Sequence, residues 1–391
     1  MSASFLGGCG DDAANFDHTT GGAGGASAGS GAGGSKSGSG GTGEPGGASG
    51  SAGKPTGGSS SGGSATAGNA GMGMGGGGGI PPIDCSKVPN EPVMVEELEG
   101  PRGYHGLVFD SSGNLIGNDS NNLLKATKQG MAKLHAAGIG MVEGMDIFPD
   151  GDIVLLTQKD DDFARTLIRL TPNGGESVLT TFGDAYGVRI GADGFVYVAG
   201  MEDSPFDPED PFDPENPIDP VDPGGFSGNV YRVDPKTGDR KALTPFEGWL
   251  PRVMDYSPDK KRFYVGTLSN GEGNGKVYVY ELNAQGTPTG APKLFADDVG
   301  GGYHDGLGVD ACGNVFVADF IETALYRITP DGKAKLYQDW KSTDEQPSDY
   351  GHGIAWGNGI GGWDVSSIFL PQPYDDNTVV RVDVGVPARP R

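Results

Sequence analysis

Six polar side chains stand at comparable places along the chain, and five of them are followed directly by glycine. The five occur in the segments YHGL, VEGM, AYGV, HDGL and GHGI, and the sixth occurs in PRVM. In chain order they are His105, Glu143, Tyr186, Arg252, Asp305 and His352. Imidazoles and carboxylates hold divalent cations or move protons, and a phenol or guanidinium orients an oxyanion. Brought together, they predict a catalytic or binding site; the alternative is a ring of polar groups that satisfy one another and buried water.

The elements that must position these residues are short strands. The clearest stretch, Gly302 to Trp340, contains the runs GLGVD, NVFVAD, ALYRIT and KAKLYQ, with the turn-forming segments ACGN and TPDG after the first and third. The same unit recurs along the chain, and this recurrence is the sequence signature of a β-propeller. Sustained helical periodicity is not found, so we predict an all-β protein.

The repeats predict six blades, the last of which is completed from the other end of the domain. Five units have four strands, whereas the sixth has three: GIAWG, SSIFLPQ and TVVRVDVG. The lone strand PVMVEEL at 92–98 supplies the missing one, because propellers close their ring with a blade built from both termini. We therefore predict a six-bladed β-propeller over residues 81–391, with an insertion at 202–225 in the third blade.

Propeller topology assigns directions to the polar residues. The first strand of each blade lines the central channel, so the six side chains are expected at one rim of it, called the top here. A small-molecule ligand is expected at this rim, with Tyr186 and His304, the neighbour of Asp305, as substrate-binding residues. On the bottom face, Cys85 and Cys312 fall in adjacent blades, which favours a disulfide between them and an oxidising compartment.

The N-terminal residues differ in composition from the rest. The run from Gly21 to Gly79 holds much of the chain's 73 glycines and has almost nothing to bury. We predict a disordered Gly/Ser-rich tether over 10–80. Residues 1–9 end in FLGGC, which resembles a bacterial lipoprotein box after a truncated signal, so we expect the true start upstream and lipidation of Cys9. The expected location is the bacterial cell envelope, anchored by lipid in the outer membrane and facing the periplasm or the surface; the alternative is a cytosolic protein.

Charge limits the partners that the chain can bind. The formal net charge is −24, from 28 Lys+Arg against 52 Asp+Glu. This argues against nucleic acid and anionic lipid, which demand clustered basic side chains, and leaves membrane attachment to the lipid anchor. The insertion carries proline at every third position from Pro205 to Pro223, which favours an exposed acidic polyproline II excursion over a calcium-responsive arm or a partner ligand.

A family resemblance rests on two of these blades. The segments HDGLGVDACGNVFVADF and PRVMDYSPDKKRFYV resemble the gluconolactonase/regucalcin (senescence marker protein-type) family of six-bladed propellers. The resemblance implies a calcium or similar divalent ion at the top of the channel that assists lactone hydrolysis. Of the family's metal-binding motif positions, Asp305 matches, whereas His105 and Arg252 replace a glutamate and an asparagine and Tyr186 stands where a further asparagine is common. A guanidinium disfavours calcium, so the residue types suggest zinc, manganese, iron or no metal.

Two functions follow from these residues. In the first, the protein is a gluconolactonase-like hydrolase of a small lactone or ester. Asp305 and Glu143 are then metal ligands or the base, and His105 and His352 transfer protons or bind the metal. Arg252 stabilises developing negative charge. In the second, the protein is a non-catalytic propeller that binds a ligand or protein and has lost the family metal site.

Overall fold

A computed structural model gives the structure of most of the predicted propeller. It describes residues 83–99, 105–119, 121–128, 133–159, 164–201, 228–246, 248–269, 274–340, 352–372 and 378–388. All of these belong to one compact unit, Gly76–Arg391. The signal-like segment with Cys9, the tether and the acidic insertion lie outside the described residues.

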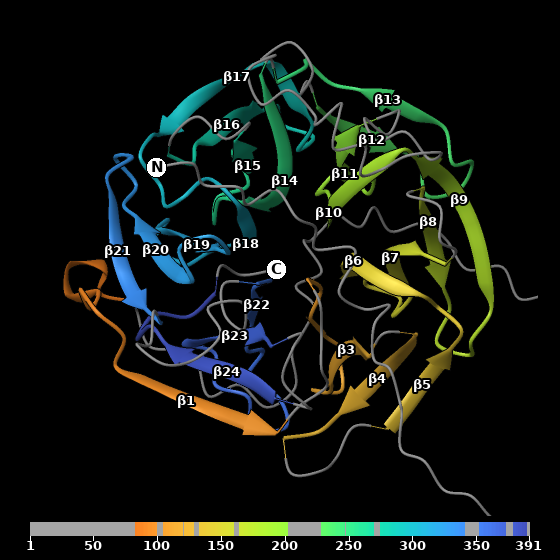
Figure 1. Ribbon diagram of the computed structural model, residues 1–391, viewed down its shortest axis with the longest axis horizontal. Coiled ribbons are helices and arrows are strands. Elements are labelled where there is room, and N and C mark those ends of the chain that lie inside the picture. The colour runs from red at the N-terminus through yellow and green to blue at the C-terminus, as the bar shows by residue number, and fades with distance from the viewer. Residues whose placement is uncertain are drawn as a thin grey trace, which may run out of the picture. The chain divides into compact units, whose positions relative to one another are not determined.

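Six antiparallel four-stranded sheets surround a central axis (Figure 1). The first three blades consist of β2 (Val108–Phe109), β3 (Leu115–Asp119), β4 (Asn122–Ala126) and β5 (Lys133–Ala137); β6 (Met141–Ile147), β7 (Ile153–Gln158), β8 (Arg165–Leu170) and β9 (Glu176–Phe182); and β10 (Asp184–Ile190), β11 (Val196–Met201), β12 (Asn229–Val233) and β13 (Arg240–Ala242). The next two consist of β14 (Trp249–Tyr256), β15 (Arg262–Ser269), β16 (Val277–Leu282) and β17 (Pro288–Ala296); and β18 (His304–Val309), β19 (Val315–Asp319), β20 (Ala324–Ile328) and β21 (Ala334–Asp339). The predicted six-bladed propeller is confirmed.

The sixth blade joins the two ends of the domain. It contains β22 (Ala355–Trp356), β23 (Ser367–Pro371), β24 (Thr378–Asp383) and, as its outer strand, β1 (Met94–Glu99). β1 pairs antiparallel with β24 from Met94↔Asp383 to Glu99↔Thr378, which confirms the predicted closure. Apart from the 3-10 turn η2 (Cys85–Lys87), the described residues contain strands, turns and loops, and none of their helices is long and apolar enough to cross a membrane.

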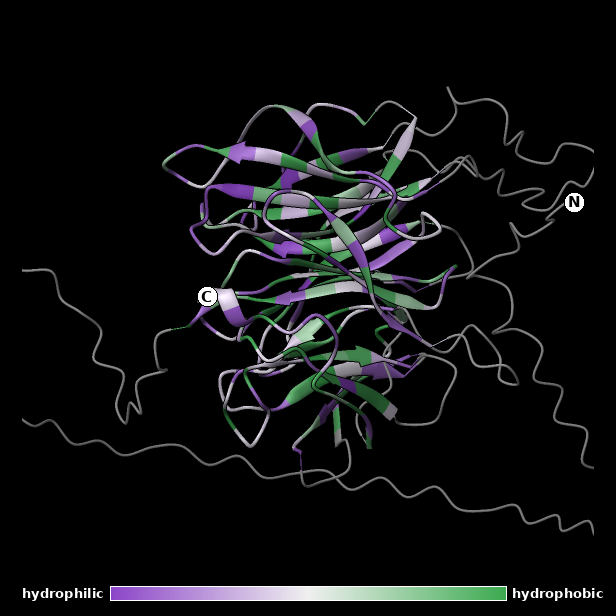
Figure 2. Ribbon diagram, turned by 90° about the vertical axis from the view of Figure 1, so that its left-hand side faces the viewer, coloured by the Kyte–Doolittle hydropathy of each residue, from purple (hydrophilic) through white to green (hydrophobic). Residues whose placement is uncertain are grey.

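The hydrophobic core is divided among the blade interfaces. Each of six buried clusters combines residues of two neighbouring blades, with blade six packing on blade one. β7 shows how the sequence does this: Ile153 and Leu155 face blade one, whereas Val154 and Leu156 face blade three. Successive side chains of a strand point to opposite faces, so a blade buried on both sides needs a continuous apolar run. Hydrophobic stretches accordingly follow the strands (Figure 2).

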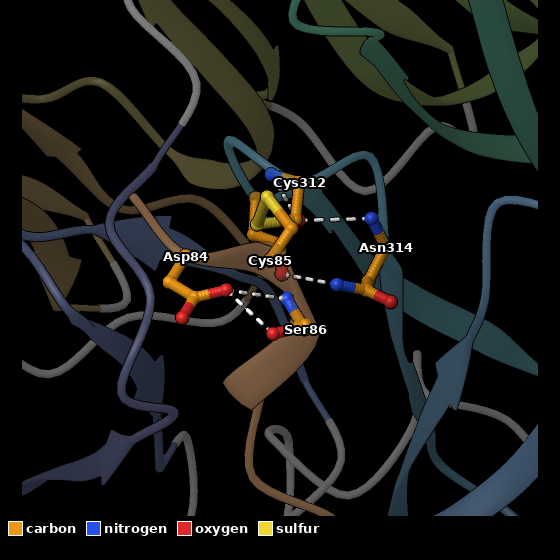
Figure 3. Close-up of a disulfide and its surroundings, with 6 residues drawn as sticks. Asp84, Cys85, Ser86, Cys312 and Asn314 are labelled. Atoms are coloured by element: carbon orange, nitrogen blue, oxygen red, sulfur yellow. Dashed lines mark hydrogen bonds between the residues drawn. A yellow bond between two sulfur atoms is a disulfide. The ribbon is translucent and has the colours of Figure 1, made fainter. Parts of the chain in front are cut away.

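Both ends of the domain meet at the turn that follows β18. Cys312 in this turn forms a disulfide with Cys85 of η2, with a Cα–Cα distance of 5.5 Å (Figure 3). Asp310 fixes the turn, because its Oδ1 accepts hydrogen bonds from the backbone of Cys312 and of Asn314, each at 2.8 Å. The C-terminal segment docks on the same turn through Ala311 N, which donates to the Pro387 carbonyl at 2.9 Å.

Candidate functional site

The ring of six polar residues at the channel mouth is built by irregularities in the first strands. In β6, β10, β14 and β18 the pairing register with the second strand shifts at Glu143, Tyr186, Arg252 and Asp305. A bulge of this kind leaves one residue out of the ladder and redirects its side chain. The other two members, His105 and His352, precede β2 and β22. Five of the six line one cavity, and the sixth, His352, lies beside Asp305 with its Nδ1 3.3 Å from Asp305 Oδ2.

The glycines that follow the ring residues let neighbouring blades approach at the axis. A methyl group on Gly187 would lie 2.1 Å from the Arg252 carbonyl oxygen, and one on Gly353 would lie 2.1 Å from that of His105. Gly144 makes a similar approach to blade three, at 2.3 Å. Real side chains cannot occupy such positions, so glycine at this place closes the ring tightly enough to bring the six side chains together.

Two arginine–carboxylate pairs face each other across the channel mouth, with one imidazole between the two carboxylates. Arg252 donates from Nε and Nη2 to Asp305 Oδ1, at 3.1 and 2.6 Å. His105 lies between two carboxylates, with Nδ1 3.4 Å from Asp305 Oδ2 and Nε2 3.5 Å from Glu143 Oε2. Arg165 Nη2 lies 3.0 Å from Glu143 Oε1. Each carboxylate therefore turns one oxygen to an arginine and the other to the same imidazole.

Asp305 is the centre of this arrangement. Its side chain is 1% exposed, and its Oδ2 also faces His352 Nδ1 at 3.3 Å. Both imidazole nitrogens lie farther from Oδ2 than the roughly 2.9 Å of a well-formed hydrogen bond. A buried oxygen in this state is a position where a further positive group fits.

The surrounding charges set the protonation of the site. Burial alone raises the pKa of Asp305, but the charge of Arg252 and the two imidazoles outweigh it and hold that pKa well below its usual range. Burial lowers the pKa of His105, whereas Asp305 and Glu143 raise it more, so the net shift is upward. At neutral pH Asp305 is therefore a carboxylate that attracts cations.

The Arg252 guanidinium contacts two aromatic rings in addition to Asp305. Its Cζ lies 3.6 Å from the centroid of the Tyr186 ring and 4.2 Å from that of Tyr303, which makes two cation–π contacts. The Tyr186 hydroxyl donates to Asp184 Oδ2 at 2.7 Å, and burial raises the pKa of both groups. Tyr186 and Arg252 thus support the ring, with two guanidinium nitrogens committed to Asp305.

His304 is not at the channel, so its expected role in substrate binding is not supported. It is fully buried, its Nε2 lies 2.8 Å from the Val299 carbonyl oxygen, and its Nδ1 accepts from Thr267 N at 3.2 Å. Neighbouring residues of a strand point to opposite sides, so the residue before Asp305 faces blade four. Burial lowers the pKa of this imidazole.

Three residues of the site were not anticipated: Arg165, Asp184 and Tyr303. Arg165 begins β8, the third strand of its blade, and strand order alone places that residue at the top, so topology could have found it. Asp184 begins β10 and is buried. Tyr303 carries no signal in the sequence, because its contact with Arg252 depends on how two blades pack.

The cavity beneath the ring is small. It offers about 40 Å³ to water molecules, and a water needs roughly 10–15 Å³ on the same measure. Farther down, Arg189 reaches from blade three to the next two blades, donating to the carbonyls of Met254 at 2.8 Å and Leu307 at 3.4 Å. The described channel therefore has room for an ion with a few waters, and an organic molecule has to lie above the ring.

The donor set fits a transition metal better than calcium. His105, Asp305 and His352 form the group among the described residues whose ligand atoms all lie within 4.8 Å of one another. Ligands about 2.0–2.2 Å from an ion in tetrahedral directions are roughly 3.4 Å apart, close to the observed 3.3 and 3.4 Å. Two imidazoles and a carboxylate suit zinc, manganese or iron, whereas calcium takes six to eight oxygens. Glu143, predicted as a ligand, is not in this group.

Comparison with known proteins places the fold in context. Residues 187–348 match the family described as the SMP-30/Gluconolactonase/LRE-like region. No curated protein matches the chain in sequence. Among solved structures, a gluconolactonase from Xanthomonas campestris is similar at 13% identity and a TM-score of 0.53, over 76% of this chain and 92% of the other. The calcium-binding protein regucalcin from Agrobacterium tumefaciens is similar at 16% identity and a TM-score of 0.50, over 75% and 97%.

These findings identify the class. The chain is a six-bladed β-propeller with a polar site at the mouth of its channel. Residues 187–348 are similar to the SMP-30/Gluconolactonase/LRE-like region, so the resemblance noted in the fourth and fifth blades is confirmed. At these identities the likeness to solved structures shows the fold.

Proposed function

We propose that the channel mouth is a transition-metal site that hydrolyses a small lactone or ester. The observation that carries this proposal is the buried Asp305 Oδ2, which faces two imidazole nitrogens at 3.4 and 3.3 Å, the spacing of metal ligands. The substrate class is supported by the family match, since the name of that family includes gluconolactonase, a lactone-hydrolysing enzyme.

The residues at the channel mouth would have separate roles in this reaction. His105, Asp305 and His352 would hold the ion, which when bound polarises a carbonyl and lowers the pKa of water. Arg252 donates two hydrogen bonds to Asp305 Oδ1, which keeps that carboxylate charged and fixes its orientation. The narrow cavity below excludes the substrate, so the reacting carbonyl would approach from above the ring. The sequence suggested an oxyanion role for Arg252; its contacts favour a role in holding Asp305.

Metal content and turnover together test the proposal. Full-length protein would be stripped with chelator, exposed separately to Zn²⁺, Mn²⁺, Fe²⁺ and Ca²⁺, and analysed by elemental analysis and with a panel of lactones and aryl esters. We expect about one transition-metal ion per chain, weak binding of calcium, and turnover that chelator removes and metal restores. Asp305→Asn and His352→Ala should lose both.

A matched control separates site effects from lost stability. Asp193 is a buried carboxylate paired with Arg232 Nε at 2.9 Å in the turn between β10 and β11. Asp193→Asn should keep full metal content and turnover. Turnover that is insensitive to chelator and to Asp305→Asn would overturn the hydrolase.

The second candidate is a propeller that binds an ion or ligand without catalysis. The small volume beneath the ring favours it, because the described cavity accommodates an ion but no substrate. In that case the metal content of the wild type and its loss in Asp305→Asn would be as above, while the lactone and ester panel would show no turnover.

We also propose that the protein is anchored in the bacterial envelope through Cys9. The FLGGC segment, the Gly/Ser-rich composition after it, and a disulfide typical of oxidising compartments support this location. Mass spectrometry of membrane-fraction protein should find a lipid-modified cysteine, and Cys9→Ser should release the protein from that fraction. A wild-type protein without lipid and in the soluble cytosolic fraction would contradict the anchor.

A further inference from the structure

We propose that Glu143 is a positioning residue: it accepts the Nε2 proton of His105 and so fixes the ring nitrogen that binds the metal. The inference rests on the metal site proposed above and assigns Glu143 a place outside the ligand set. It also assigns Arg165, which the sequence did not single out, the task of holding Glu143.

The two ring nitrogens of His105 face two different carboxylates. His105 Nδ1 lies 3.4 Å from Asp305 Oδ2, and its Nε2 lies 3.5 Å from Glu143 Oε2. When Nδ1 binds a metal, the remaining proton resides on Nε2. The His105 side chain is 8% exposed, so this N–H needs a protein acceptor, and the Glu143 carboxylate is the acceptor that faces Nε2.

Glu143 is suited to accept this proton. The Glu143 side chain is 3% exposed, and its Oε2 accepts no hydrogen bond among the described residues. The bulge at Glu143 turns this residue out of the β6–β7 ladder and towards the channel. A buried carboxylate oxygen that faces an imidazole and has no other donor is suited to orient that imidazole and to increase its basicity.

Arg165 keeps Glu143 in place. Arg165 Nη2 lies 3.0 Å from Glu143 Oε1, and the Arg165 side chain is 8% exposed. Arg252 contacts Asp305 Oδ1 in the same way. The two arginines thus neutralise two buried carboxylates, one of which would contact the metal while the other contacts a ligand of the metal.

Affinity and a spectroscopic signal test this role. Full-length wild type, Glu143→Leu and Glu143→Gln would be titrated with Co²⁺ and Zn²⁺ in competition with a chelator. We expect Glu143→Leu to weaken binding by about 10–100-fold. Glu143→Gln should retain most of the affinity, because its amide oxygen still accepts from Nε2. Asp193→Asn controls for loss of a buried carboxylate and should bind as the wild type does.

Proton NMR of the Co²⁺-loaded protein reports on the hydrogen bond directly. The exchangeable imidazole N–H of His105, identified by its absence in His105→Ala, should be shifted by the metal and slow to exchange in the wild type. It should remain in Glu143→Gln and disappear by exchange in Glu143→Leu. Arg165→Met should speed its exchange, since Glu143 is then no longer held.

The outcomes separate this inference from the proposed function. Metal binding without any turnover would overturn the hydrolase while the affinity series still supports positioning by Glu143. Equal affinity in wild type and Glu143→Leu, with the N–H signal unchanged, would overturn positioning alone. Equal and severe losses in Glu143→Leu and Glu143→Gln would show that Glu143 is itself a ligand, which also overturns it. A wild type that binds neither ion removes both.

Discussion

Replacing Arg252 by methionine is the sharpest test of how the channel mouth is held together. The substitution keeps much of the side-chain volume between the rings of Tyr186 and Tyr303 and removes the charge next to Asp305. Arg252 and Asp305 are each 1% exposed at their side chains, so water cannot replace the lost partner. Removing one member of a buried ion pair costs about 3–5 kcal/mol, because the other charge is left uncompensated.

The cost should depend on pH in a defined direction. In the wild type the pKa of Asp305 lies well below its usual range, so this group contributes stability above the unfolded pKa of about 4 and loses it as pH falls through the folded pKa. Without Arg252 that contribution is lost, and protonation of Asp305 relieves the buried charge. The difference between wild type and Arg252→Met should therefore be largest near neutral pH and shrink below about pH 4.

Urea unfolding of chelator-treated protein between pH 3.5 and 7 gives the measurement, with metal removed so that ion binding does not contribute. The double variant Arg252→Met/Asp305→Asn removes both charges and should recover most of the loss, leaving it within about 1–2 kcal/mol of the wild type. A double variant no more stable than Arg252→Met at neutral pH would falsify the account of Asp305 as a charge that depends on Arg252.

Three further predictions concern the disulfide, the glycines of the ring and Tyr186. Cys312→Ser removes the bond to Cys85, which spans a sequence separation of 227 residues. Under non-reducing conditions the substitution should lower the free energy of unfolding by about 2–5 kcal/mol. Under reducing conditions the variant should be as stable as the reduced wild type. Gly187→Ala places a methyl group 2.1 Å from a backbone oxygen and should cost at least about 1–3 kcal/mol in urea unfolding. Gly106→Ala, which meets a flexible methionine at 3.1 Å, should cost less; the reverse order would contradict the ring-closure argument. Tyr186→Phe keeps the ring over the guanidinium and loses one hydrogen bond, so thermal unfolding should report about 1 kcal/mol, well below the cost of Tyr186→Leu.

The fold could be predicted because each blade repeats the same local sequence pattern. Turn-forming residues and apolar runs mark each strand, and the three-stranded last unit, together with the lone run at 92–98, determines the closure. The ring of polar residues followed by glycine was visible for the same reason, since one position recurs in every blade.

The site itself was harder to predict, because its contacts depend on bulges and on packing between blades. Asp305 and His304 are adjacent in sequence, yet one faces the channel and the other the blade interface, which strand alternation alone could have indicated. The partners of Glu143, His105 and Arg165, follow from where the bulge directs its side chain, and residue types do not contain that information. Tyr303 shows the remaining difficulty: its ring contacts Arg252 of the neighbouring blade, and the contact depends on how the two blades pack.

The disulfide at the bottom turn determines where mechanical force would enter the domain. Cys85 precedes β1 in the chain and is covalently bonded to Cys312 in blade five. A pull on the N-terminal side of Cys85 is therefore transmitted to blade five and does not peel β1 from β24, where backbone hydrogen bonds would break one after another. In the oxidised protein the closing strand is shielded from tension, and after reduction the same strand becomes the first element to carry it.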